Sequence, residues 1–179
     1  MNKTTLMFLL AVAAWLASSS FSFAQVQGTG DEWDVLNQEA ASLYRQGQYA
    51  QAEALLQRSL AMQEKALGSD HSDVGTNLNN LATVYRVQGK YEQAEVLLKR
   101  SLAIKEKTYG PNHPDVATAL NNLATLYFAQ GRYSQAEPIF DRSLAIRERI
   151  LGANHPDVAV VLNNLGALYR KQGQYAQAE

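Results

Sequence analysis

Apolar residues follow a helical pattern through most of the chain from about residue 31 onward. One stripe consists of Leu120, Leu123, Ala124 and Tyr127. These positions fall at i, i+3, i+4 and i+7, which places them on one face of an amphipathic helix. A second stripe with helical spacing follows Gly131 and consists of Tyr133, Ala136, Phe140, Ser143, Leu144 and Ile150. The pattern predicts two successive helices, which we call helix A and helix B.

The ends of both helices carry recognisable signals. The HPD sequence at 113–115 starts helix A, because a proline in the first turn costs no backbone hydrogen bond and an early carboxylate favours the helix dipole. Gly131 ends helix A. Gly152 closes helix B as a left-handed cap, and Gly68 and Gly110 have the same role in the preceding sequence.

Two features bear on how the helices pack. Ala124 in helix A and Ala136 in helix B are small enough to let the two axes approach closely. Pro138 lies past the first turn of helix B, where it costs a hydrogen bond, so a local bend rather than a helix end is expected there.

The helix pair recurs every 42 residues, at turn glycines that are each followed two residues later by a tyrosine: Gly47, Gly89, Gly131 and Gly173. The units span about 34–68, 73–110, 115–152 and 157–179, and the last is incomplete. One helix pair cannot bury both of its faces, so the units are expected to stack into an all-α solenoid. The A helices should line its concave side.

The repeated positions resemble the tetratricopeptide repeat, a pattern matched here by Leu123, Ala124, Tyr127, Gly131, Tyr133, Ala136 and Phe140. The 42-residue period, with NNLA and HPDVA, is similar to the kinesin-light-chain type in particular, which is found widely in bacterial proteins. The resemblance covers about 34–179. It implies a right-handed α-solenoid that holds an extended peptide or a partner domain in its groove, with no cofactor and no active site of its own.

The first and last units depart from the family pattern. The first lacks one residue before Gly47, so it is expected to act as an amino-terminal cap. The last stops at Glu179, a few residues into its helix B. We therefore expect a fragment of a longer protein or a truncated gene product. The bare helix A of that unit would favour self-association.

The first 24 residues have the pattern of a secretory signal peptide. Lys3 provides a positive start, residues 6–17 are an unbroken apolar run, and small Ser22 and Ala24 suit a signal peptidase. The run is shorter than the roughly 20 residues needed to cross a bilayer. We predict cleavage after Ala24, a short linker over 25–33, and a periplasmic or secreted protein without a membrane anchor; the alternative is an uncleaved anchor.

Composition narrows the chemistry further. The chain has no cysteine, which excludes disulfides, thiolate nucleophiles and cysteine-ligated metals. Its formal net charge of −1 and its 18% of charged residues argue against a nucleic-acid or membrane-surface binder held by bulk charge. Phosphate-binding glycine loops and nucleophile elbows are absent from the sequence, so catalysis has no support.

If tetratricopeptide geometry holds, one set of A-helix side chains projects into the groove: Asn79, Asn121, Asn163, Thr83, Thr125, Arg45, Arg86, Phe128, Arg170 and Lys171. An amide both donates and accepts, as gripping a peptide backbone requires. The alternative is that the three asparagines only satisfy one another between stacked helices. Their neighbours Asn80, Asn122 and Asn164 are turned about 100° around the helix axis and are assigned to bonding between helices.

The arginines indicate the charge of the ligand. Arg45, Arg86 and Arg170 are predicted to recur at one groove position and can bind carboxylates through two hydrogen bonds, so an acidic partner segment is expected. Phe128 replaces arginine in the third unit and offers an apolar patch. The alternative is a merely solvated basic edge.

The histidines and the outer charges have structural explanations. His71, His113 and His155 lie one repeat apart in separate loops, too far from one another to share a metal ion, and are predicted to bond loop backbone at helix starts. The outer pairs are predicted to be solvated: Glu64 with Lys65, Glu106 with Lys107, and Glu148 with Arg149.

Three classes of function remain after these observations. The first is a protein-binding scaffold outside the cytoplasm, and it needs nothing beyond the sequence. The second is the recognition array of a larger exported enzyme, for example a caspase-like peptidase, whose catalytic domain is not in this chain. The third is binding of single-stranded RNA, against which export and the acidic mature charge both count. The first is our prediction, with no nucleic-acid partner.

Overall fold

The computed structural model describes residues 32–173. The predicted signal peptide at 1–24, most of the linker at 25–33 and the last residues of the unit at 157–179 lie outside the described residues. Nothing about the predicted cleavage after Ala24 follows from the fold.

The described residues are entirely helical apart from their turns. Residues 32–45 form the first described helix, which belongs to the first unit. It is followed by α2 (Tyr49–Leu67), α3 (Ser72–Val87), α4 (Tyr91–Tyr109), α5 (Pro114–Ala129), α6 (Tyr133–Leu151) and α7 (Pro156–Gln172). The helix over 32–45, α3, α5 and α7 are therefore the A helices of the four units, and α2, α4 and α6 are the B helices.

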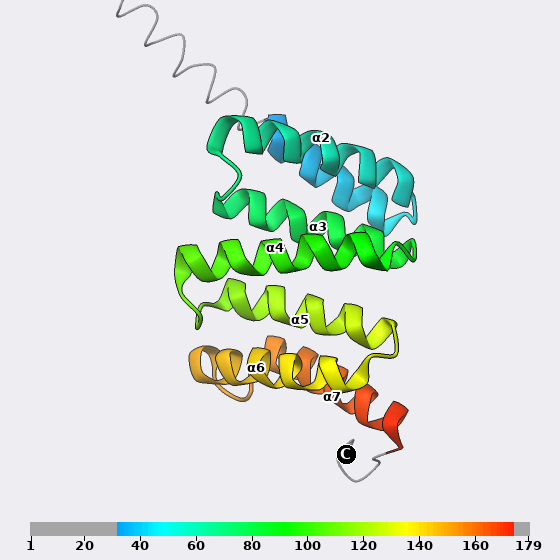
Figure 1. Cartoon of the computed structure of the whole chain (residues 1–179), viewed down its shortest axis with the longest axis vertical. Helices are drawn as coiled ribbons and strands as arrows, with labels where there is room; N and C mark the ends of the chain where they lie inside the picture. The colour runs from blue at the N-terminus through cyan, green and yellow to red at the C-terminus, as the bar shows by residue number, and fades with distance from the viewer. Residues whose placement is uncertain (1–31, 174–179) are drawn as a thin grey trace, which may run out of the picture.

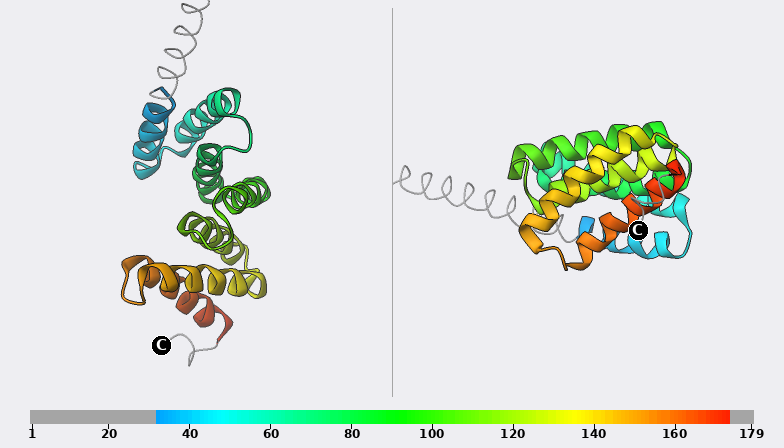
Figure 2. Two further views of the ribbon diagram at one scale, coloured as in Figure 1. Left: turned by 90° about the vertical axis from the view of Figure 1, so that its left-hand side faces the viewer. Right: turned by 90° about the horizontal axis from the view of Figure 1, so that it is seen from below.

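Successive helices stack as antiparallel neighbours along one axis (Figure 1). Within a unit, α3 packs against α4 and α5 against α6. Between units, each B helix packs against the next A helix, and the A helices also touch one another, α3 with α5 and α5 with α7. The array curves, with the helix over 32–45 and α7 on the inner side (Figure 2). The all-α solenoid predicted from the repeat is confirmed.

One continuous core runs along the axis of the array. Ala52, Ala94 and Ala136 occupy the same position in successive B helices and are fully buried. They pack with larger residues such as Leu98 and Phe140 in the same cluster. The small side chains let the helices approach closely, as the sequence predicted, and Phe140 is the largest fully buried residue.

The predicted start signals are confirmed. His71, His113 and His155 are the N-caps of α3, α5 and α7. Each imidazole Nδ1 accepts a hydrogen bond from the backbone N–H two residues later, at 3.1 to 3.2 Å. The donating N–H group lies in the first turn of the helix, whereas we had predicted a bond to the backbone of the loop. It satisfies one of the helix's free N–H groups.

The predicted end signals need a correction. Gly68, Gly110 and Gly152 do have positive φ, between 82° and 89°, but their ψ values of 154° to 165° are extended rather than left-handed helical. This backbone region is open essentially only to glycine. Pro138 is exposed, and α6 continues through it without ending, as predicted.

Part of the outer charge is paired rather than merely solvated, contrary to the prediction. Arg100 donates to Glu64 at 2.6 Å, and Arg142 donates to Glu106 at the same distance. Lys107 also reaches the carboxylate of Asp70 at 2.6 Å. These ion pairs join successive units, and a pattern read within one helix does not reveal them.

Candidate functional site

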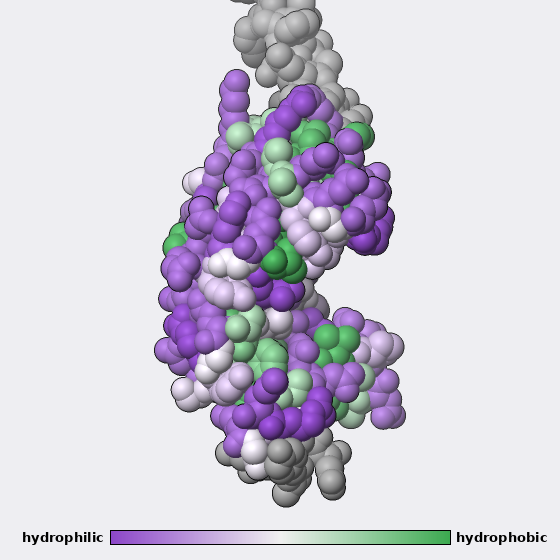
Figure 3. Space-filling model, turned by 90° about the vertical axis from the view of Figure 1, so that its right-hand side faces the viewer, coloured by the Kyte–Doolittle hydropathy of each residue, from purple (hydrophilic) through white to green (hydrophobic). Residues whose placement is uncertain are grey.

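The inner side of the curve is hollowed, at the right edge of the view in Figure 3. Side chains of the A helices line it, among them Tyr44, Asn80 and Thr83. We call this surface the groove. Its position on the A helices is the one that the sequence predicted.

The first unit has a different register from the one read off its sequence. The N–H of Gln48 bonds the carbonyl oxygen of Leu43 at 2.9 Å, just as the N–H of Arg132 bonds Tyr127 at 2.9 Å. Leu43 is thus equivalent to Tyr127, which lies two repeats of 42 residues further along the chain. The first unit therefore lacks no residue before Gly47. Tyr44, not Arg45, consequently occupies the position of Arg86.

The aromatic contacts confirm this register. The rings of Tyr44 and Tyr49 lie 5.5 Å apart, and those of Phe128 and Tyr133 also lie 5.5 Å apart. The row along the groove is therefore aromatic, cationic, aromatic, cationic: Tyr44, Arg86, Phe128 and Arg170. Arg45 lies one residue further on and remains exposed at the groove. The prediction that three arginines share one groove position is wrong for Arg45. Tyr44 occupies that position in the first unit and was not among the predicted groove residues.

The asparagines form a ladder between A helices. Asn122 donates to the side-chain oxygen of Asn79, and Asn164 donates to that of Asn121, both at 3.1 Å. Asn122 and Asn164 thus bond between helices as predicted. Asn79 and Asn121 accept these bonds, so they satisfy amides between stacked helices, which is the alternative role, and Asn121 is buried.

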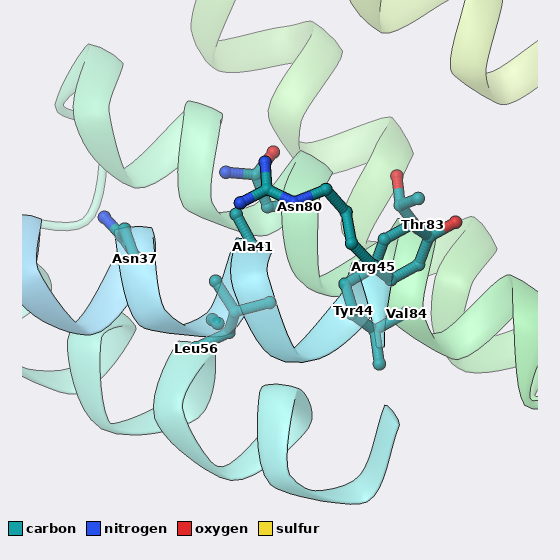
Figure 4. Close-up of a pocket in the computed structure, with 9 residues that line it drawn as sticks. Asn37, Ala41, Tyr44, Arg45, Leu56, Asn80, Thr83 and Val84 are labelled. Atoms are coloured by element: carbon teal, nitrogen blue, oxygen red, sulfur yellow. The ribbon is translucent and has the colours of Figure 1, made fainter. Parts of the chain in front are cut away.

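The ladder is not continued in the first unit, where a cavity opens instead (Figure 4). Its volume is about 310 Å³, and it is lined by Asn37, Ala40, Ala41, Tyr44, Arg45, Leu56, Asn80, Thr83 and Val84. Asn80 is exposed here rather than bonded between helices, contrary to its assignment. The lining combines an apolar floor with amide, hydroxyl and guanidinium groups and includes no carboxylate.

The other predicted groove residues differ in their hydrogen bonds and in how exposed their side chains are. Thr83 and Thr125 donate to the carbonyl oxygens of Asn79 and Asn121 in their own helices, at 3.0 and 2.8 Å. Arg86 and Phe128 are half-buried, whereas Asn163, Arg170 and Lys171 are exposed on α7. The structure thus places all ten predicted residues on the A helices.

A second, smaller cavity of about 110 Å³ lies between α3, α4 and α5, and most of the residues that line it have polar side chains. Lys105, whose side chain is only 7% exposed, donates to Thr76 at 2.7 Å and pairs with Asp115 at 3.0 Å. The equivalent Arg147 donates to the carbonyl oxygen of Asp157 at 2.9 Å. These buried cations tie a B helix to two A helices, and sequence reasoning missed them.

A further charged cluster joins each B helix to the next A helix, and we call each such contact a junction. At the α4–α5 junction, Glu95 accepts hydrogen bonds from Arg132 at 2.7 Å and from Tyr127 at 3.0 Å, and it pairs with Lys99 at 2.7 Å. The bonds from Arg132, followed by that from Lys99, lower the pKa of Glu95 to about 2. The carboxylate is therefore firmly ionised.

At the α6–α7 junction, a negative charge replaces one of the positive charges of the α4–α5 junction. Asp141 replaces Lys99, four residues after Glu137, which is equivalent to Glu95. Partial desolvation and the neighbouring Glu137 raise the pKa of Asp141. Burial, followed by the charges of Glu137 and Asp141, raises the pKa of Tyr169. Nothing in the local pattern of one unit points to this difference.

Within 32–173, no three histidine, aspartate or glutamate side chains are grouped closely enough to hold a metal ion. Among the helices that the structure describes, none is both long and apolar enough to cross a bilayer.

Comparison with known proteins agrees with this geometry. The family model "Tetratricopeptide repeat" matches residues 34–107, 73–149 and 115–179. No curated protein is significantly similar in sequence. The matched family is a repeat scaffold and not a catalytic family.

Solved structures give the same result. BtubC (BKLC) from P. vanneervenii is 26% identical with a TM-score of 0.73, over 82% of this chain and 58% of that one. A kinesin-light-chain-like protein of Podospora anserina with nearly identical TPR-like repeats is 28% identical with a TM-score of 0.74, over 81% of this chain and 69% of that one. This chain therefore spans little more than half of BtubC.

A more distant structure shares the fold alone. The first TPR of Spaghetti (RPAP3), bound to the HSP90 peptide SRMEEVD, is 16% identical with a TM-score of 0.56, over 80% of this chain and 94% of that one.

Proposed function

The chain belongs to the tetratricopeptide repeat family, and we propose that it is a scaffold whose groove binds an extended, acidic peptide or partner domain. Proteins of this fold bind protein or peptide partners, as the Spaghetti complex illustrates. The acidic character of the ligand is the part of the proposal that this chain's own residues support.

The cavity between the helix over 32–45 and α3 is the observation that carries the proposal. Its lining contains Arg45 and two amides but no carboxylate. Arg86 and Arg170 recur further along the same surface. Guanidinium groups bind carboxylates through paired, charge-assisted hydrogen bonds, whereas the exposed amide of Asn80 suits a peptide backbone.

Charge reversal in the groove tests this proposal. The double variant Arg86→Glu/Arg170→Glu should weaken binding of a fluorescent acidic octapeptide, measured by anisotropy, by about tenfold or more, since each lost charge pair costs on the order of 1 kcal/mol. Lys65→Glu/Arg149→Glu is the control, because both residues are exposed on B helices and the net charge changes equally. Equal affinities of the two variants would exclude the acidic ligand.

We also propose that the protein acts outside the cytoplasm, in the periplasm or after secretion. The charged start, the short apolar run and the small residues before Ala24 support export. The intact mass of the protein purified from its native source tests this. A species beginning at Gln25 is expected, and a species that retains Met1 would overturn the proposal.

We also propose that two copies of the chain associate through α7. Leu162 is 47% exposed, whereas its equivalents Leu78 and Leu120 are only 0% and 3% exposed. Covering this apolar surface with a second copy would remove it from water. Light scattering should detect dimers that the Leu162→Glu variant lacks, and a strict monomer at high concentration contradicts the idea.

A further inference from the structure

The three junctions repeat one arrangement of side chains. Each has a glutamate on the B helix, a residue four positions later, and a tyrosine on the next A helix. The sets are Glu53, Gln57 and Tyr85; Glu95, Lys99 and Tyr127; and Glu137, Asp141 and Tyr169. The chain thus contains three versions of one site, which permits a direct comparison.

The first two versions both bind a cation from the residue after a turn glycine. Lys90 lies 2.7 Å from the carboxylate of Glu53, and its Nζ is 5.2 Å from the ring centre of Tyr85. Arg132 lies 2.7 Å from Glu95, and its guanidinium carbon is 4.1 Å from the ring centre of Tyr127. The glutamate and the tyrosine therefore form a cation receptor at both junctions.

The third version keeps the glutamate and the tyrosine, as Glu137 and Tyr169, but has different charged residues around them. Tyr169 lies beside Glu137, at the position equivalent to that of Tyr127, which bonds Glu95. The residue that follows the turn glycine is Gln174, and the sequence over 174–179 has no lysine or arginine. Within the part of the chain that the structure describes, no lysine, arginine or histidine forms a salt bridge with Glu137 or Asp141.

A second carboxylate makes the third receptor more acidic than its counterparts. Glu95 has Lys99 four residues later, whereas Glu137 has Asp141, which is exposed. Two carboxylates on one helix face repel each other, and an external cation would relieve that repulsion. Partial desolvation, followed by the charge of Glu137, raises the pKa of Asp141.

We propose that Glu137, Asp141 and Tyr169 form a docking site for an arginine side chain of a partner protein. Arginine fits better than lysine because its planar guanidinium binds carboxylates through two hydrogen bonds and stacks on an aromatic ring. The Arg132 guanidinium over Tyr127 shows this geometry within the same molecule. This site lies apart from the basic groove and takes a ligand of opposite charge.

Titration of the full chain with N-acetyl-arginine amide, followed by NMR of the Tyr169 ring resonances, tests the proposal. The neutral isostere N-acetyl-citrulline amide is the matched probe. We expect the arginine probe to bind about fivefold or more tightly than the citrulline probe, the range for one exposed charge pair. Equal shifts with both probes would overturn the site.

Two variants with the same charge change sharpen the test. Asp141→Lys recreates the Glu95–Lys99 pattern and should abolish the arginine-dependent shift. Glu148→Lys, at an exposed position further along α6, should retain it. Both variants should still bind the acidic octapeptide. Loss of the arginine shift in both variants contradicts the proposal, whereas loss of octapeptide binding alone concerns only the groove.

Discussion

The α4–α5 and α6–α7 junctions have the same backbone and almost the same core but opposite electrostatics. Ala94 and Leu98 pack at the first, Ala136 and Phe140 at the second, and all four are buried. Around Glu95 the first junction gathers two cations, whereas around Glu137 the second gathers another carboxylate. In a repeat array, one buried apolar pattern therefore tolerates junctions of very different charge.

This tolerance arises because the burial of apolar side chains contributes more to the free energy of folding at each junction than the ion pairs do. A buried leucine or phenylalanine contributes roughly 1.5–3 kcal/mol by leaving water, whereas an exposed ion pair contributes about 0–1 kcal/mol. The array therefore folds whichever charges surround the core. A change in charge should therefore affect the two junctions differently while the fold is kept.

The largest effect is expected from neutralising the central glutamate. Glu95→Gln removes a carboxylate that accepts charge-assisted bonds from Arg132 and also binds Tyr127, so it should destabilise the α4–α5 junction by about 1–2 kcal/mol. The matched Glu137→Gln removes half of a like-charge pair and should be neutral or stabilising. Denaturant midpoints and hydrogen exchange of α5 and α7 measure both effects. Equal losses in the two variants would show that the junctions do not differ.

Acidification should move the two junctions in opposite directions. The pKa of Glu95 is lowered from 4.5 to about 2, so its stabilising contribution is present above pH 4.5 and is lost as the pH falls toward 2. The pKa of Asp141 is raised above 3.8, so its contribution is full below that pH and is lost as the pH rises through the folded-state value.

Amide exchange measured between pH 7 and pH 3, corrected for intrinsic rates, tests these signs. Protection of α7 relative to α5 should increase on acidification. The Asp141→Asn variant is the control, because it lacks the titrating group at the second junction and should show a smaller increase. A parallel loss of protection in both helices would contradict the assignment.

A smaller effect is expected from exchanging the charge at position 141. Asp141→Lys turns a like-charge i, i+4 pair into an opposite-charge pair, each worth roughly 0.2–0.5 kcal/mol, so α6, which carries both residues, should gain about 0.5 kcal/mol of local stability. Lys99→Asp makes the converse change in α4. Hydrogen exchange of the helix that carries the pair measures both, and gains or losses of the same sign in the two variants would contradict the comparison.

The sequence predicts the fold far better than it predicts these differences. The 42-residue period and the apolar stripes determine the helices, and the HPD signals determine where the A helices begin, because both are local patterns. The position of Arg45 was predicted wrongly because one residue was taken to be missing from the first unit, whereas the constant 42-residue spacing and the turn hydrogen bond of Leu43 both place Tyr44 opposite Arg86.

The candidate site was only partly predictable for a similar reason. The asparagine ladder links Asn79 to Asn122, and the outer ion pairs link residues such as Glu64 and Arg100, so both depend on how units stack. The charge at position 141 is visible in the sequence, but its meaning depends on the receptor that the structure shows around Glu95 and Tyr127.

The smallest effect is expected from salt, and it distinguishes attraction from repulsion. Raising the ionic strength from about 0.01 M to 0.15 M shortens the Debye length from about 30 to 8 Å, which screens exposed charges at both junctions. Screening weakens the attraction of Arg132 and Lys99 for Glu95 but also weakens the repulsion between Glu137 and Asp141. Protection of α5 should therefore fall slightly while that of α7 rises, by a few tenths of a kcal/mol. Sodium chloride is the salt to use, because guanidinium chloride would also occupy the proposed arginine site. A rise in α7 protection that persists in Asp141→Asn would show that relief of this repulsion is not its cause.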